Sequence, residues 1–140
     1  MTNVKLAKRA EISAPPCLRR LRALEEDKII LGYHAEVNAE ALDYNITAFV
    51  QVKLGSNNDH DIREFEDTIA RAPQVRECHL LVGDHDFLLR VVAHSWDDYQ
   101  KFLTSELTSA PHVSQIKSSL AIRRSKYLAG VPLEITEIKN

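Results

Sequence analysis

The sequence is poor in cysteine and has no long apolar run. Its two cysteines, Cys17 and Cys78, are far apart and form no CxxC pair, which excludes a disulfide framework and a cysteine-rich zinc cage. No stretch approaches the roughly 18 consecutive apolar residues of a membrane-spanning helix, and the N-terminus lacks the layout of a signal peptide. We therefore expect a cytoplasmic protein with no membrane among its partners.

The motifs of common enzymes are also missing. There is no GxSxG, no P-loop, no Rossmann glycine pattern and no histidine beside an evident nucleophile. Trp96 and Tyr99 are interpreted as helix core rather than as a cofactor site. His79, His85 and His94 lack a paired cysteine or a close set of carboxylates, so we expect no metal site. The sequence thus predicts neither an enzyme nor a cofactor.

What the sequence does have is an uneven distribution of charge. The formal net charge is only −2, but residues 1–24 hold six basic side chains and a single acidic one, Glu11. The six are Lys5, Lys8, Arg9, Arg19, Arg20 and Arg22. A basic head on an acidic body is typical of a chain in which a small part contacts phosphate. With 140 residues and 44% apolar content, the chain can bury one core and carry a small appendage.

The basic head has the pattern of two short helices. Residues 3–10 and 17–27 both have helical apolar spacing, and Ser13 is a plausible N-cap ahead of Pro15-Pro16, which suit a first turn. Two helices joined by a tight turn are typical of a helix-turn-helix.

The predicted DNA-binding residues lie around the second helix of the head. Arg19, Arg20 and Arg22 are candidates for contacts to phosphate or a guanine edge, and Ser13 with nearby N–H groups for a phosphate at the helix start. The alternative is a solvated basic face.

The body alternates between strand and helix patterns. A strand at 29–37 is expected to link it to the head, and the order that follows is β-α-β-β-α-β, the ferredoxin-like arrangement of an α+β fold. The expected strands are 46–54, 75–82, 87–93 and 112–123, and the expected helices are 59–72 and 95–107. The predicted division is 1–28 for a partial helix-turn-helix, 29–44 for a linker strand, 45–126 for the ferredoxin-like domain and 127–140 for a tail.

Two motifs resemble a known family. The segment from Pro16 to Glu26, with Ile29-Ile30 and Gly32-Tyr33 after it, resembles the recognition helix and linker of the Lrp/AsnC feast/famine regulators. Residues 77–80 and 83–89 resemble the central hairpin of that family's sensing domain. The resemblance runs over essentially the whole chain. It implies a transcription regulator that binds double-stranded DNA and responds to an amino acid or similar effector through ligand-dependent oligomerisation.

The head departs from the family pattern in one respect. The DNA-binding unit of the family has three helices, and the first has no counterpart here, so Met1 is expected to be an internal methionine or the start of a short form. Without that helix, Val4, Leu6, Leu18 and Leu21 lose a packing partner. Each poorly buried side chain then loses about 1–2 kcal/mol of its stabilising burial free energy.

The resemblance also points to an effector site. In the family, effectors lie near the hairpin loop, between dimers, with a contribution from the last strand. The matching residues here are Gly83, Asp84 and Asp86, with Ser118, Ser119 and Leu120. Carboxylates beside unpaired N–H groups suit an amino acid's ammonium and carboxylate. The alternative is a plain turn in which Gly83 has a positive φ and the aspartates bond their own backbone.

The resemblance further implies a homodimer that assembles into larger rings, and the alternation at 46–54 favours burial of a sheet face against a partner. Two other functions stay open. Tetrapyrrole (sirohaem-type) decarboxylases are similar to this family in head and body, and haem-like absorbance would favour them. A headless sensor would bind effector without contacting DNA.

Overall fold

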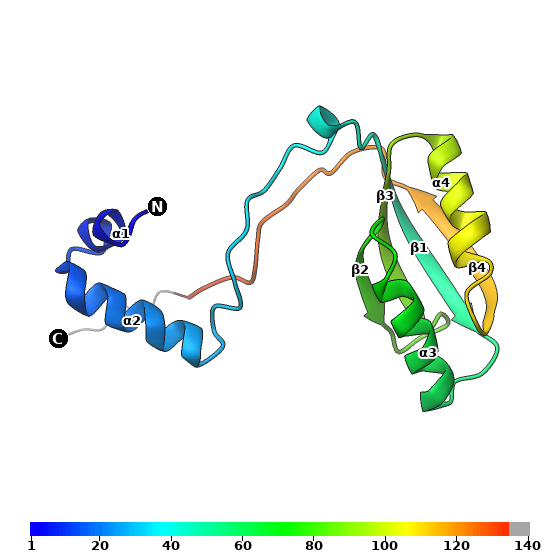
Figure 1. Cartoon of the computed structure of the whole chain (residues 1–140), viewed down its shortest axis with the longest axis horizontal. Helices are drawn as coiled ribbons and strands as arrows, with labels where there is room; N and C mark the ends of the chain where they lie inside the picture. The colour runs from blue at the N-terminus through cyan, green and yellow to red at the C-terminus, as the bar shows by residue number, and fades with distance from the viewer. Residues whose placement is uncertain (135–140) are drawn as a thin grey trace. The chain divides into compact units, whose positions relative to one another are not determined.

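The computed structural model describes residues 1–134 and divides the chain into two compact units, Met1–Val37 and Asn38–Asn140 (Figure 1). The finer boundaries expected at residues 28, 44 and 126 stay predictions. Within the described residues, no helix is long and apolar enough to cross a membrane.

The first unit contains two packed helices. Helix α1 spans Asn3–Arg9, and the Thr2 side chain accepts a hydrogen bond from its backbone. Helix α2 spans Ala14–Glu26 and starts earlier than the apolar spacing predicted, because the two prolines fit its first turn. The buried side chains of the pair are Ala7 and Cys17, and the Asn3 amide donates to the Ala14 carbonyl at 3.3 Å.

The strand expected at 29–37 is absent, which corrects the prediction of a linker strand over 29–44. Residues 31–38 have no strand partner within the described chain, and residues 40–42 form a short 3₁₀ turn. Ile29, Leu31, Tyr33 and Val37 are all exposed. Alternation reports only how side chains point along an extended segment; a strand also requires a neighbouring strand to complete its hydrogen bonds.

The second unit is a four-stranded antiparallel sheet covered on one face by helices (Figure 1). The strands lie in the order β2-β3-β1-β4, and the chain order is βαββαβ, which confirms the predicted α+β fold. The elements are β1 (Ile46–Leu54), α3 (Asp59–Ala70), β2 (Val75–Leu80), β3 (Phe87–Ala93), α4 (Trp96–Phe102), a π-helical turn (Leu103–Leu107) and β4 (Val113–Leu120).

The tail from residue 127 contains no strand up to residue 134. The remainder of the predicted tail, residues 135–140, lies outside the described residues.

The core lies between the sheet and its helices. The sequence analysis used the alternation of β1 as an argument for a sheet face buried against a partner chain. In the structure, the alternating apolar residues of β1 pack against the helices of the same chain. The fully buried side chains of the core include Val50, Val52, Phe65, Phe87, Leu89, Val91, Tyr99, Phe102 and Leu107. The opposite face of β1 mixes Thr47, Gln51 and Lys53 with a partly exposed Phe49, so it is less apolar than expected.

Candidate functional site

The loop between β2 and β3 is held to the end of β1. Its first and last residues are joined by a hydrogen bond of 2.7 Å from the Leu81 N–H to the Asp86 carbonyl. The Asp86 N–H donates to the Val52 carbonyl at 2.9 Å, and the Asp86 carboxylate accepts from the Leu54 N–H at 2.7 Å. Asp86 therefore completes the hydrogen bonding of β1, which is a role in the fold.

The tip of the same loop is open. Gly83 and Asp84 are exposed, and Asp84 forms no hydrogen bond or ion pair within residues 1–134. Gly83 has a positive φ of 159°, as the plain-turn alternative expected, and L side chains rarely adopt that conformation. The Asp86 carboxylate, however, bonds to β1 rather than to the loop's own backbone. The plain-turn alternative thus holds for Gly83 and not for Asp86.

The three predicted residues of β4 differ in surroundings. The Ser118 hydroxyl is hydrogen-bonded to the hydroxyl of Tyr99, which is buried on α4. Ser119 pairs with Phe49 on β1 and is exposed. Leu120 ends the strand opposite Ala48 and is 46% exposed. The sequence predicted that Tyr99 lies in the core stripe of the second helix of the body. A buried tyrosine hydroxyl needs a hydrogen-bond partner, but the sequence did not indicate that this partner is Ser118.

Within one chain, the loop and the β4 residues are not brought together. Asp86 lies at the level of residues 52–54 of β1, while Ser119 lies opposite Phe49. At about 3.4 Å per residue, Ser119 lies roughly 14 Å from Asp86 along the strand, and Ser118, which lies opposite Val50, roughly 10 Å, both on the other edge of β1. A site containing both the loop and these residues would need more than one copy of the chain.

Of the three histidines weighed in the sequence, His79 and His94 have partners of their own and His85 does not. His79 contacts the Glu77 carboxylate at 3.3 Å. Arg90 donates a hydrogen bond of 2.8 Å to the same carboxylate, and this bond, with a smaller contribution from His79, holds the pKa of Glu77 below its usual value. His94 stacks on Tyr44. His85 has a buried Nε2 with no hydrogen-bond partner among the described residues. An unpartnered buried nitrogen is costly, so His85 is a second polar group of the loop with unmet bonding capacity.

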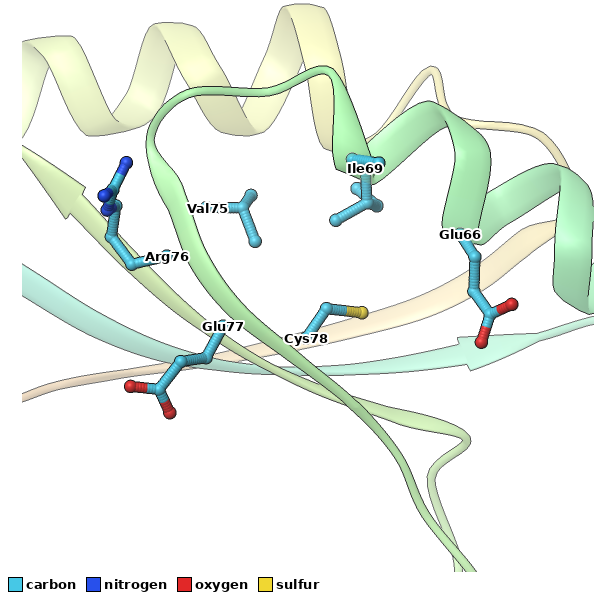
Figure 2. A pocket seen from close by; sticks show the side chains of 7 residues that line it. Glu66, Ile69, Val75, Arg76, Glu77 and Cys78 are labelled. Atoms are coloured by element: carbon cyan, nitrogen blue, oxygen red, sulfur yellow. The ribbon is translucent and has the colours of Figure 1, made fainter. Parts of the chain in front are cut away.

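A shallow cavity of about 300 Å³ lies between α3 and β2 (Figure 2). Cys78, Glu66 and Ile69 are among the residues that line it, and none of the predicted effector residues does. Burial and the nearby Glu66 carboxylate raise the pKa of the Cys78 thiol to about 11. This thiol is therefore a poor nucleophile at neutral pH.

The predicted DNA-contacting residues are all exposed. Arg19, Arg20 and Arg22 extend from α2 into solvent. Ser13 is the N-cap of α2, but its side chain makes no capping bond. Pro15 and Pro16 have no N–H, and the Cys17 N–H donates to the Ser13 carbonyl, which leaves Ala14 as the backbone donor of the first turn. A phosphate there would be held mainly by side chains.

This combination, a ferredoxin-like domain with an open loop and a basic two-helix segment in one chain, defines a ligand-sensing DNA-binding protein. The family model of the Lrp/AsnC ligand binding domain matches residues 47–131 of the sequence. The family model of a winged helix-turn-helix DNA-binding domain matches residues 1–30.

Proteins of similar sequence and structure are transcriptional regulators. The chain is 44% identical over 126 residues to a leucine-responsive regulatory protein of Rhizobium meliloti (90% of this chain, 81% of the relative). It is 40% identical over 128 residues to the Bkd operon transcriptional regulator of Pseudomonas aeruginosa (91% and 84%). A regulator from Neisseria meningitidis, solved as an L-Met complex, superposes with a TM-score of 0.88 at 30% identity (94% and 85%).

The chain belongs to the Lrp/AsnC family of transcriptional regulators. These relatives are regulators and not enzymes, so the tetrapyrrole decarboxylase alternative has no support.

The bond from Leu54 to the Asp86 carboxylate predicts a difference between the two aspartates of the loop. Asp86→Ala leaves a strand-end N–H without its charged acceptor and should lower the free energy of unfolding by about 1–3 kcal/mol. Asp84→Ala should change it by less than about 0.5 kcal/mol. Urea unfolding followed by circular dichroism, at one protein concentration, measures both. Equal stability of the two variants would show that Asp86 has no part in the fold.

The raised pKa of Cys78 predicts slow alkylation. With a pKa of about 11, roughly one thiol in a thousand is ionised at pH 8, so the rate with iodoacetamide should rise about tenfold per pH unit. Glu66→Gln should lower the pKa and speed the reaction, because one nearby negative charge is removed. A rate that levels off near the ordinary thiol pKa of about 8.5 would contradict the prediction.

Proposed function

We propose that this regulator binds double-stranded DNA through α2 and an amino acid at the loop between β2 and β3, and that effector binding changes its assembly. The observation that carries the proposal is the presence, in one chain, of matches to a DNA-binding segment and to a ligand-binding domain. In this proposal the protein acts in the cytoplasm, where DNA and free amino acids are both available.

The surface of α2 supports contact with DNA. Three arginines project from one helix, and exposed guanidinium groups bind phosphate and guanine well. The buried side chains Ala7 and Cys17 anchor the other side of the two-helix segment. Arg19, Arg20 and Arg22 are the proposed contacts, with Ser13 at the helix start.

The hairpin loop supports binding of a zwitterion. Asp84 offers a free carboxylate to an α-ammonium group, while Gly83 places backbone beside it without a side chain. The Neisseria relative was solved with L-Met, a ligand of the same chemical class. Asp86 positions the loop through its bonds to β1.

The separation of the loop from Ser118, Ser119 and Leu120 supports a site shared between copies. Residues too far apart within one chain can meet when two chains pack together. We propose a homodimer that assembles into larger rings, with the effector bound where the loop of one copy approaches β4 of another. Ligand bound at such a contact shifts the population of assembled states.

A thermal-shift screen of the full chain against the twenty amino acids tests the sensor. An effector should raise the melting temperature, since binding to the native state stabilises it by RT ln(1 + [L]/Kd), about 2.7 kcal/mol at 100 times Kd. Asp84→Asn should remove the rise. Asp67→Asn, an exposed charge change on α3, serves as the matched control. No rise with any amino acid would refute this part of the proposal.

Fluorescence anisotropy with a labelled mixed-sequence duplex tests the head. Arg19→Ala, Arg20→Ala and Arg22→Ala should each weaken binding, and each lost phosphate contact should reduce the salt slope by about 1. Arg63→Ala on α3 removes the same charge from the body and should bind as the unaltered chain does. Failure of the unaltered chain to bind DNA would refute this part of the proposal and, together with a positive thermal-shift screen, would favour the headless sensor.

A further inference from the structure

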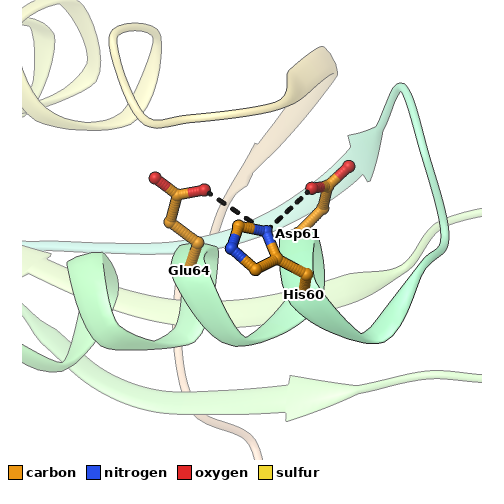
Figure 3. Close-up of side chains that lie close together, drawn as sticks. All are labelled: His60, Asp61 and Glu64. Atoms are coloured by element: carbon orange, nitrogen blue, oxygen red, sulfur yellow. Dashed lines mark hydrogen bonds and ion pairs between the residues drawn. The ribbon is translucent and has the colours of Figure 1, made fainter.

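Four potential metal ligands converge where α3 begins and β4 is about to start. His60, Asp61 and Glu64 lie in the first turns of α3, and His112 directly precedes β4. Figure 3 shows the His60 ring placed between the two carboxylates. The ligand atoms of His60, Asp61 and Glu64 all lie within 4.8 Å of one another.

The second histidine reaches the same carboxylates from the other segment. His112 Nε2 lies 2.7 Å from Glu64 Oε2 and 3.4 Å from Asp61 Oδ1. His60 Nδ1 lies 3.4 Å from Asp61 Oδ1 and 4.0 Å from Glu64 Oε2. Each carboxylate is thus flanked by two imidazoles.

These separations suit a single small cation. Ligands at about 2.1 Å in a tetrahedron around zinc lie roughly 3.4 Å from each other. Of the four histidine–carboxylate separations, two have that value and the other two differ from it by 0.7 Å or less. The ligand atoms that all lie within 4.8 Å of one another are those of His60, Asp61 and Glu64, so His112 would have to move closer to His60 to complete the tetrahedron. Small changes in side-chain torsion would equalise the separations, because His60 is 83% exposed and free to turn.

Hydrogen bonds from neighbouring residues already hold two of the four ligands, Asp61 and His112. Asp61 is 13% exposed, and the Asn58 side chain accepts from the Asp61 N–H and donates to the Asp61 carboxylate. His112 has a left-handed φ of 67°, and its carbonyl accepts from the Gly55 N–H at 2.8 Å. A residue other than glycine is uncommon there, and the conformation directs this imidazole toward the carboxylates.

We propose that His60, Asp61, Glu64 and His112 bind one divalent transition-metal ion of the zinc class. Two imidazole nitrogens and two carboxylate oxygens form a borderline set that suits such ions better than calcium or magnesium, which prefer oxygen alone. The ion would replace the hydrogen bond between His112 and Glu64, and any proton on either histidine would pass to solvent. It would also join the start of α3 to the turn before β4.

One feature distinguishes this cluster from the histidines weighed in the sequence. His79, His85 and His94 do not share a pair of carboxylates, whereas His60 and His112 do.

Calorimetric titration of the chelator-treated full chain with zinc chloride near neutral pH tests the proposal. We expect one ion per chain, and at least about tenfold weaker binding in His60→Gln and in His112→Gln. His79→Gln removes a histidine that also contacts a carboxylate, and Cys78→Ser removes the thiol on β2. Both of these controls should bind zinc as the unaltered chain does.

Two outcomes would overturn the site: the absence of stoichiometric binding to the unaltered chain, or undiminished binding in both His60→Gln and His112→Gln. Loss of binding in Cys78→Ser or His79→Gln alone would place the metal elsewhere and overturn it equally. His60→Gln keeps the test decisive even if His112→Gln unfolds, because an 83% exposed side chain has little part in folding.

Discussion

The hydrogen bonding of β1 along both edges is the constraint on which the second unit depends. β3 pairs with one edge and β4 with the other, so the register of three strands is set by a single segment. That register directs Ala48, Val50, Val52 and Leu54 toward α3 and α4. A slip by one residue would turn the whole set outward, so the core and the sheet specify each other.

The C-terminal end of β1 is where this framework meets both candidate sites. The Leu54 N–H is bonded to the carboxylate of Asp86, beside the proposed effector loop. The next N–H, on Gly55, is bonded to the carbonyl of His112, which belongs to the proposed metal cluster. The last residue of β1 and the glycine that follows it therefore support two loops, one leading into β3 and the other into β4.

The sequence predicted most of the regular structure, because apolar spacing reports directly on which face of an element is buried. It failed at residues 29–37, where alternation was present and a pairing strand was not. Family resemblance selected the loop and β4 residues, but their environments depend on strand register: Asp86 serves the fold, and Ser118 bonds Tyr99. His60, Asp61 and Glu64 are close in sequence, whereas His112 is 48 residues from Glu64 and joins them only through the fold.

The bond between Ser118 and Tyr99 links a proposed recognition residue to the hydrophobic core. Tyr99 is 1% exposed, so its hydroxyl has little access to water as a substitute partner. Selection for a new effector at position 118 would therefore also act on the identity of residue 99. Related regulators that diverge in specificity should keep this pair together or replace both members, so the diversity available at this strand is narrower than its exposed position suggests.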